Sequence, residues 1–232
     1  MNLRPSLLEA LLNRLRSQLR LKLLLLLALP TLALAGYFAV QRVLIFPVRT
    51  MPLTWLDRVI PFEPAWVWVY LSLNLLNPVG PLLTRSRFEL LRYTRGIAFL
   101  FASGLVCFFF FPVKGPRPAG AGGSWLYGHL IQIDRVYNSL PSLHAACAVY
   151  AVLYASYVSA GSSRPVLRKV LLCLAWLWVA LILYATIATR QHFSIDLPPG
   201  IALAWLAQRL LLPRPHPAVA PKQIFFVRGE AG

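Results

Sequence analysis

Several long runs of apolar residues constrain the fold of this chain more than any other feature of its sequence. An α-helix needs about 20 mostly apolar residues to cross the roughly 30 Å hydrocarbon core of a bilayer. Six segments approach this length, at 23–40, 65–83, 96–113, 142–159, 170–189 and 197–212. Charged residues account for only 13% of the 232 residues, about half the share found in soluble domains. We therefore predict an all-α polytopic membrane protein, a bundle of six transmembrane helices.

The segments that flank this bundle differ from it in composition. Residues 1–22 combine leucines at helical spacing with Arg14, Arg16 and Arg20, which predicts a basic amphipathic segment lying on an anionic membrane surface. A frayed basic tail is the alternative. Residues 23–212 form the predicted membrane domain, and we interpret its first apolar run as an uncleaved anchor rather than a signal peptide. Residues 213–232 are rich in proline and are predicted to form a cytoplasmic tail.

The basic residues predict the orientation of the chain. The formal net charge is +16, from 23 Lys and Arg against 7 Asp and Glu. If the N-terminus is cytoplasmic, sixteen of the 23 basic residues fall on the cytoplasmic side. The positive-inside rule therefore predicts that both termini are cytoplasmic. The bases lie between apolar runs, which favours contacts with anionic lipids on the cytoplasmic side and argues against a nucleic-acid partner.

Three short polar groups stand between the apolar runs. Residues 114–118 follow the third run, residues 137–144 open the fourth, and residues 189–196 join the fifth to the sixth. The predicted topology places all three on the same, non-cytoplasmic side, although the count of basic residues did not use these motifs. A shared side predicts that the three groups form one site.

The basic residues of these groups are suited to binding phosphate. Arg117, Arg190 and Lys114 carry the charges that bind phosphate oxygens, and arginine can make two parallel hydrogen bonds. Ser142 stands at a predicted helix N-terminus, where free backbone amides favour an anion. The chain has no cluster of carboxylates for magnesium, so we expect no metal and no other cofactor.

The two histidines of these groups are suited to phosphoryl transfer. Of His144 and His192, one can attack phosphorus while the other protonates the departing alkoxide. Asp196 follows His192 by four residues, and its carboxylate can reach one ring nitrogen if the loop continues helically into the last apolar run. His129 lies outside these motifs, and we expect no catalytic role for it.

The residues of the second and third polar groups resemble the motifs of a known family. Pro141-Ser142-Leu143-His144 is similar to the Pro-Ser-x-His motif of the phosphatidic acid phosphatase type 2 family, and His192 with Asp196 resembles its His-x-x-x-Asp motif. Members of this family include lipid phosphatases and lipid phosphotransferases. The segment 57–62 and the tyrosine-containing run after it are similar to the branch that contains inositol phosphorylceramide synthases. The resemblance extends from about Trp55 to Gly200, over most of the predicted membrane domain.

The resemblance implies a role for each matching residue. His192 corresponds to the nucleophile that forms a phosphohistidine, and Asp196 to the carboxylate that orients it. His144 corresponds to the general acid. Arg117 and Ser142 correspond to phosphate-binding residues.

The sequence departs from the family pattern at two basic positions. Seven residues before the Arg-Pro pair, where the family has lysine, the chain has Phe110; six residues before His192, where the family has arginine, it has Thr186. Lys114 and Arg190 are the candidate substitutes for these two residues.

Together, these features predict a metal-independent lipid phosphatase that acts through a phosphohistidine at the outer membrane face. The alternatives are a headgroup phosphotransferase similar to inositol phosphorylceramide synthases and, more distantly, an anion or lipid transporter without catalysis. Asp134, Tyr137 and Asn138 are candidate substrate contacts, with loop capping as the alternative for Asp134 and Asn138. The composition fits a bacterial inner membrane with the site facing the periplasm, with an internal eukaryotic membrane as the alternative.

Overall fold

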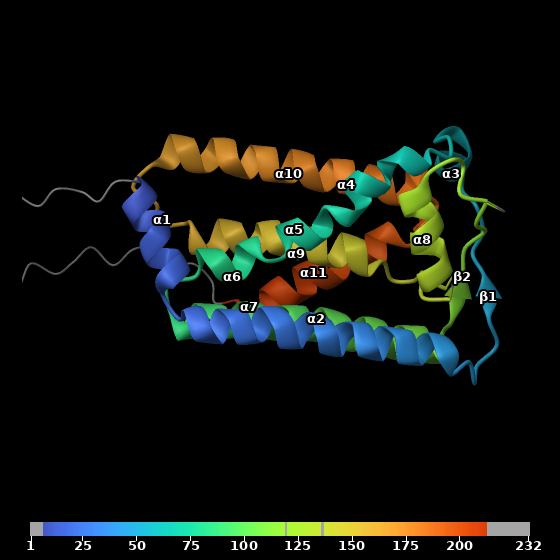
Figure 1. Ribbon diagram of the computed structural model, residues 1–232, viewed down its shortest axis with the longest axis horizontal. Coiled ribbons are helices and arrows are strands. Elements are labelled where there is room, and N and C mark those ends of the chain that lie inside the picture. The colour runs from blue at the N-terminus through green and yellow to red at the C-terminus, as the bar shows by residue number, and fades with distance from the viewer. Residues whose placement is uncertain (1–6, 119, 136, 213–232) are drawn as a thin grey trace, which may run out of the picture.

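The computed structural model describes residues 7–118, 120–135 and 137–212, and it is mainly helical (Figure 1). The long helices are α2 (Leu19–Arg42), α7 (Arg87–Phe110), α9 (Leu143–Val158), α10 (Pro165–Ala188) and α11 (Leu197–Leu211). The shorter elements are α1 (Leu7–Arg16), α3 (Trp55–Val59), η1 (Pro64–Trp66), α4 (Val67–Leu71), α5 (Leu73–Leu76), α6 (Val79–Leu83), α8 (Trp125–Ile133) and the strands β1 (Arg49–Thr50) and β2 (Val113–Lys114).

Helix α9 occupies the centre of the bundle. Its residues 143 and 145–154 are buried, and it packs against α11, α10, α7, α6 and α5. Small side chains such as Ala145, Ala146 and Ala148 lie along it, and small residues let neighbouring helices approach closely. Ser142 begins the helix by accepting a hydrogen bond on its Oγ from the amide of Ala145 at 3.2 Å, the expected contact of an N-cap serine.

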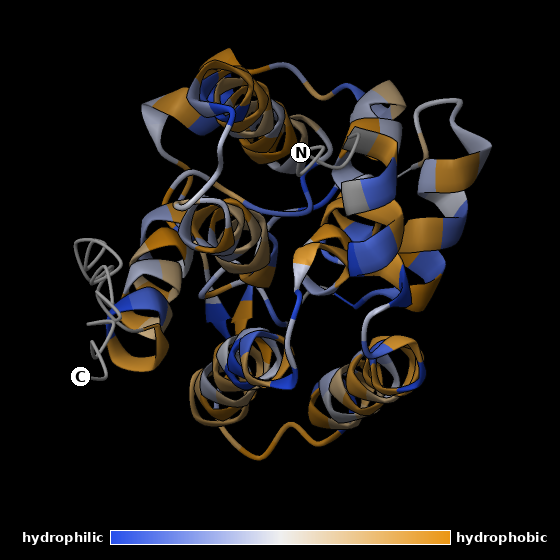
Figure 2. Cartoon of the chain, turned by 90° about the vertical axis from the view of Figure 1, so that its left-hand side faces the viewer, coloured by the Kyte–Doolittle hydropathy of each residue, from blue (hydrophilic) through white to orange (hydrophobic). Residues whose placement is uncertain are grey.

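The long helices around α9 expose apolar side chains on the outside of the bundle. Large side chains such as Leu27, Leu32 and Leu171 are exposed on α2 and α10, and hydrophobic residues appear on the outer faces of the helices in Figure 2. An apolar outer surface is costly in water and suits a lipid environment. Helices α2, α7 and α10 are long and apolar enough to cross a membrane.

The number of spans stays a prediction. At 1.5 Å per residue, the 16 residues of α9 and the 15 of α11 extend only about 24 Å. Among the described residues, three helices therefore reach spanning length, at the first, third and fifth predicted segments. The position of both termini in the cytoplasm also stays a prediction.

The second predicted span is not one continuous helix. It is divided into η1, α4, α5 and α6. Ser72, between α4 and α5, donates from its hydroxyl to the carbonyl of Val69 at 2.6 Å, a local hydrogen bond that often bends helices. Pro78 and Pro81 have no amide proton to give to a helix. The serine and the two prolines thus account for the breaks in an apolar run that otherwise predicts one helix.

The two ends of the bundle carry different connections (Figure 1). One end carries β1, β2, α3 and α8 and is called the site end here; the other carries α1 and the links from α6 to α7 and from α9 to α10 and is called the terminal end. At the terminal end, the buried Lys22 ammonium donates to the carbonyls of Arg14 and Thr84, at 2.6 and 3.0 Å. The predicted amphipathic segment is helical over α1, whereas the predicted tail lies outside the described residues.

The site end contains the only correction to the all-α prediction among the described residues. Strands β1 and β2 pair in parallel, with Arg49 opposite Val113 and Thr50 opposite Lys114. Pro112 ends α7, and the residue before a proline favours extended backbone, so the chain continues from the helix as a short strand. This pairing ties the link between α2 and α3 to the link between α7 and α8.

Candidate active site

His192 is held by Asp196 in the turn between α10 and α11. The imidazole Nδ1 lies 3.2 Å from Asp196 Oδ2, and this carboxylate oxygen also accepts the Phe193 amide at 3.1 Å. The spacing of four residues therefore brings the pair together, but in a turn before α11 rather than in a helix. With Nδ1 engaged by the carboxylate, Nε2 is the ring nitrogen that is free to react.

The turn after α10 directs His192 back toward the bundle. The amides of Gln191 and His192 both donate to the carbonyl of Thr186, at 3.1 and 3.0 Å. Arg190 adopts a left-handed conformation with φ of 54°, a position that glycine usually occupies at the end of a helix. A hydrogen bond from the Arg190 side chain stabilises this conformation, because Nη2 donates to the Ile60 carbonyl at 2.7 Å.

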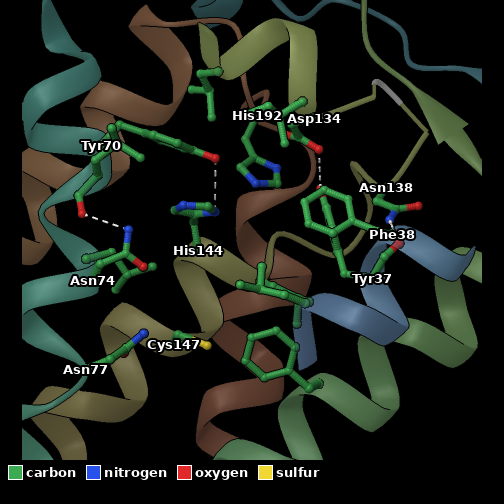
Figure 3. A pocket seen from close by; sticks show the side chains of 17 residues that line it. Tyr37, Phe38, Tyr70, Asn74, Asn77, Asp134, Asn138, His144, Cys147 and His192 are labelled. Atoms are coloured by element: carbon green, nitrogen blue, oxygen red, sulfur yellow. Dashed lines mark hydrogen bonds between the residues drawn. The ribbon is translucent and has the colours of Figure 1, made fainter. Parts of the chain in front are cut away.

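His144 faces His192 across a short distance. The centroids of the two rings are 5.5 Å apart. Tyr70 of α4 stacks on His144 with centroids 4.1 Å apart, and its hydroxyl lies 3.4 Å from His144 Nδ1. The amide of Ser142 donates to the carbonyl of Asp196 at 3.0 Å, which joins the start of α9 to the start of α11. Figure 3 shows the two histidines with Tyr70 on one side and Tyr37 on the other.

The carboxylate of Asp196 is buried and only partly neutralised. Burial raises the pKa of Asp196 above its ordinary value, although His192 and the Phe193 amide act in the opposite direction. The second carboxylate oxygen, Oδ1, has no hydrogen-bond partner among the described residues. A carboxylate in this condition favours any process that increases positive charge on the neighbouring imidazole.

Arg117 belongs to a partly buried network with Asp134. Its Nη2 lies 3.2 Å from Asp134 Oδ2 and donates to Gln191 Oε1 at 2.9 Å, while Nη1 donates to the Asp134 carbonyl. Tyr37 and Gln41 donate to the other oxygen of Asp134, at 2.9 and 2.8 Å. Asp134 therefore holds the guanidinium in place as well as lining the cavity described next.

A cavity of about 220 Å³ begins at the two histidines and continues between α2, α4, α5 and α9. Its lining is mostly apolar, and the polar exceptions are the following residues: Tyr37, Tyr70, Asn74, Asn77, Asp134, Asn138, His144 and His192. The buried Asn138 donates from Nδ2 to the Tyr37 carbonyl at 3.3 Å. A largely apolar cavity next to polar groups has the character of a site for an apolar ligand with a polar head.

Several buried polar atoms near Arg117 have few hydrogen-bond partners or none. Among the described residues, Arg190 Nη1 has no partner, and Gln191 Nε2 and the hydroxyl of Tyr127 have none except the interaction that they make with each other. Burial raises the pKa of Tyr127, although the charge of Arg117, a hydrogen bond from Gln191 and the charge of Arg190 act against this rise. Since a buried donor without an acceptor costs free energy, this group is suited to receive the oxygens of an anion.

Three predicted residues lie apart from this arrangement. Lys114 is exposed in β2, and in the described part of the chain its ammonium makes no hydrogen bond. Tyr137 does not line the cavity, and its carbonyl accepts the Val113 amide at 3.1 Å. Ser142 is fully buried, and its Oγ caps α9.

Asp57 braces the loop that carries His192. It accepts hydrogen bonds from the Ser194 amide at 2.8 Å, the Ser194 hydroxyl at 3.0 Å and the Thr54 amide at 2.9 Å. With Thr54 it forms a capping box at the start of α3. Burial acts to raise the pKa of Asp57, but these hydrogen bonds outweigh it and keep the pKa below the ordinary value.

The sequence reasoning missed Tyr70 and Gln191. Tyr70 lies inside an apolar run, and only a tertiary contact places its ring on His144. Gln191 precedes His192 directly, so its position in the motif was the one signal that pointed to it. Phe110 and Thr186, which stand where the family has basic residues, make no polar contribution from their side chains to the site: Phe110 is exposed, and the Thr186 hydroxyl bonds within α10.

Comparison with known proteins shows which family the chain is similar to. The sequence profile of the PAP2 superfamily matches residues 36–210, which includes the two histidines, Asp196 and Arg117. No curated protein and no solved structure matches the chain.

Proposed function

Because the chain belongs to the PAP2 superfamily, whose members are generally phosphatases or related phosphoesterases, we propose that it is a metal-independent lipid phosphatase of the membrane with a histidine nucleophile. The observation that carries the proposal is the buried pair of His192 and Asp196 at the head of a largely apolar cavity. The ring centroid of His192 lies 5.5 Å from that of a second histidine, His144. The family makes a phosphatase or phosphotransferase activity the general expectation. The assignment of roles to residues is ours.

In the first half of the proposed reaction, Nε2 of His192 attacks the phosphorus of the lipid phosphate. The phosphorus–nitrogen bond forms as the bond to the lipid oxygen breaks, and His144 gives a proton to the departing oxygen. The lipid leaves as an alcohol, or as a lipid monophosphate where the substrate is a diphosphate. The imidazole of His192 then carries positive charge, which the buried Asp196 carboxylate stabilises at Nδ1.

In the second half, a water molecule attacks the phosphohistidine. His144, now neutral, accepts a proton from this water, the phosphorus–nitrogen bond breaks, and inorganic phosphate leaves. His192 and His144 return to their starting protonation states. A lipid hydroxyl in place of water would yield transfer instead of hydrolysis through the same intermediate, which is the alternative function.

Charge neutralisation supports both halves of the reaction. We propose that Arg117, fixed by Asp134 and Gln191, binds the phosphate oxygens together with the unpartnered Nη1 of Arg190. Such preorganised donors stabilise the charge that develops in the transition state. Ser142 acts by fixing the start of α9, and the exposed Lys114 attracts the anionic headgroup without contacting it in the reaction.

The apolar cavity indicates the kind of substrate. It accommodates a hydrocarbon chain next to the phosphate, as in phosphatidic acid or a polyprenyl phosphate. In the proposed topology the site end faces away from the cytoplasm, which in a bacterial inner membrane is the periplasm.

The test is phosphate release from a panel of lipid phosphates in detergent, with EDTA present, for the native chain, His192→Ala and His129→Ala. His129 is exposed and outside the site, so it serves as the matched control. We expect release from the native chain and the control and none from His192→Ala. Release retained by His192→Ala would exclude this nucleophile. A native chain that releases no phosphate but moves a labelled headgroup between lipids would instead establish the phosphotransferase.

A further inference from the structure

A second cavity, of about 280 Å³, lies beside the one that contains the histidines. Its lining residues are Phe38, Gln41, Arg42, Gln132, Ile133 and Arg135. Phe38 and Ile133 line both cavities, so the two are neighbours that share a wall. No step of the proposed reaction uses this second cavity.

The two arginines of the second cavity come from separate elements and are held together by Gln41. Arg42 is the last residue of α2, and Arg135 follows the end of α8. The Gln41 amide group pairs with the backbone of Arg135: its Nε2 donates to the carbonyl at 3.2 Å, and its Oε1 accepts the amide at 3.3 Å. Because Gln41 is only 2% exposed, this pairing is shielded from water and fixes one side of the cavity against the other.

Neither arginine is neutralised by the protein. Among the described residues, the guanidinium groups of Arg42 and Arg135 make no hydrogen bond and no ion pair, and both side chains are exposed. The nearest acidic side chain in sequence, Asp134, is already engaged by Arg117, Tyr37 and Gln41. Within the part of the chain that the structure describes, the cavity therefore has two unpaired positive charges in its lining.

The position of this cavity fits the level of lipid headgroups. Arg42 ends a helix long and apolar enough to cross the membrane, and arginines at the ends of such helices lie at the interface with water. The proposed orientation leaves only seven of the 23 basic residues on this side of the membrane, and two of them meet here.

We propose that this second cavity is a binding site for an anionic oxygen group, a phosphate or a carboxylate, carried by a lipid at the membrane surface. Arginine binds such groups through paired, charge-assisted hydrogen bonds. The group belongs either to the reacting lipid, as a second phosphate next to the one at His192, or to a separate anionic phospholipid. Gln41 links the site to the reaction, because it also holds the Asp134 carboxylate that positions Arg117.

The first experiment measures lipid retention without any reaction. The full chain in detergent is incubated with phosphatidylglycerol or phosphatidylcholine, and bound lipid is counted by native mass spectrometry. The variant Arg42→Gln/Arg135→Gln is compared with Arg49→Gln/Arg58→Gln, which removes two exposed positive charges from the same end outside the cavity. We expect the first variant to lose retention of phosphatidylglycerol by about tenfold, as expected for charged hydrogen bonds, and the control to keep it.

The second experiment identifies the source of the anionic group. Michaelis constants are measured in phosphatidylcholine vesicles for a prenyl monophosphate and the matching diphosphate, and then again with phosphatidylglycerol added. A diphosphate advantage that disappears in Arg42→Gln/Arg135→Gln assigns the site to the reacting lipid. A response to phosphatidylglycerol that disappears in this variant assigns it to a separate lipid.

Equal phosphatidylglycerol retention by the two double variants would overturn the proposal. This result is separate from the test of the nucleophile, because retention needs no catalysis. A chain that retains the anionic lipid through Arg42 and Arg135 but releases no phosphate would contradict the proposed reaction and leave this binding site in place.

Discussion

The two ends of the helix bundle differ in how completely their buried polar groups are hydrogen-bonded. At the terminal end, Lys22 donates to the carbonyls of Arg14 and Thr84, and Tyr154 donates to the carbonyl of Glu89. At the site end, buried side-chain atoms without a partner among the described residues, apart from the interaction of Tyr127 with Gln191, are found on several residues: Tyr127, Asn138, Arg190, Gln191 and Asp196. The other such atom belongs to Asn77, which lines the cavity below the histidines.

This difference indicates that one end of the bundle mainly supports the reaction and the other mainly supports the stability of the fold. A buried polar atom without a partner costs about 1–3 kcal/mol, so the site end is less stable than its packing alone would make it. Proteins retain such groups where a ligand supplies the missing hydrogen-bond partner. The polar groups described at the terminal end, such as Lys22 and Tyr154, are paired and contribute stability. Substitutions at the two ends should therefore separate loss of reaction from loss of folding.

After loss of the nucleophile, the largest expected effect comes from the proton donor at the site end. His144→Ala should lower the rate of release from an alkyl phosphate by about 10³-fold, within the range of general acid catalysis. With a nitrophenyl phosphate ester the loss should be far smaller, because nitrophenolate leaves without a proton. Because His144 also acts in the second half of the reaction, the first-turnover release of alcohol or nitrophenolate provides the measurement, and His129→Ala is the control. An equal loss on the two substrates would contradict the role of general acid.

Alanine substitutions at two glycines test the difference between the two ends of the bundle by disturbing the packing of the helices. A methyl group at Gly200 of α11 would collide with the backbone carbonyl of Ser142, whereas one at Gly96 of α7 would collide with the Tyr150 hydroxyl. Each alanine variant should lose about 1–3 kcal/mol of unfolding free energy from overpacking. Only Gly200→Ala should also lower the activity of the folded fraction, by about tenfold or more, because Ser142 and Asp196 join the two histidine-bearing segments.

Activity per folded molecule, with the folded fraction taken from thermal melting in detergent, distinguishes the two glycine variants. If Gly96→Ala lowered this activity as much as Gly200→Ala, the separation between the two ends would be wrong.

The terminal end should respond in stability alone. Lys22→Met removes the donor to the carbonyls of Arg14 and Thr84 and should reduce the free energy of unfolding by about 2 kcal/mol, the cost of unsatisfied buried acceptors. Lys169→Met, at an exposed position of α10, is the control and should leave stability unchanged. Phosphate release by the folded protein should be the same in both. A loss of activity in Lys22→Met without loss of stability would refute the division.

The smallest effect concerns acid stability and the brace of the His192 loop. Since the pKa of Asp57 in the folded protein lies below its ordinary value of 3.8, ionised Asp57 stabilises the fold above that value. This stabilisation is lost as the pH falls through the folded pKa. Asp57→Asn should thus be less stable than the native chain at neutral pH, and the difference should shrink below about pH 4. Melting temperatures of both proteins across this range measure it.

The helices were largely predictable because their signals are local. For α9 and α11, predicted and observed boundaries agree within about one residue, as apolar runs bounded by Ser142 and Pro198 predict. Helix α7 begins nine residues before the predicted span, because Ser86 caps it and the charged residues of its first turns are compatible with a helix. The breaks in the second predicted span depend on Ser72 and two prolines whose effect the apolar pattern concealed.

The sequence by itself determined the membrane class, the family, and the pairing of His192 with Asp196, because apolar length and a spacing of four residues act over short distances. Only the tertiary structure decided what surrounds them. Tyr37 reaches Asp134 across 97 residues of chain, and Tyr70 reaches His144 across 74. Such contacts, and the two neighbouring cavities, depend on how the helices pack, and packing leaves no periodic signal in a single sequence.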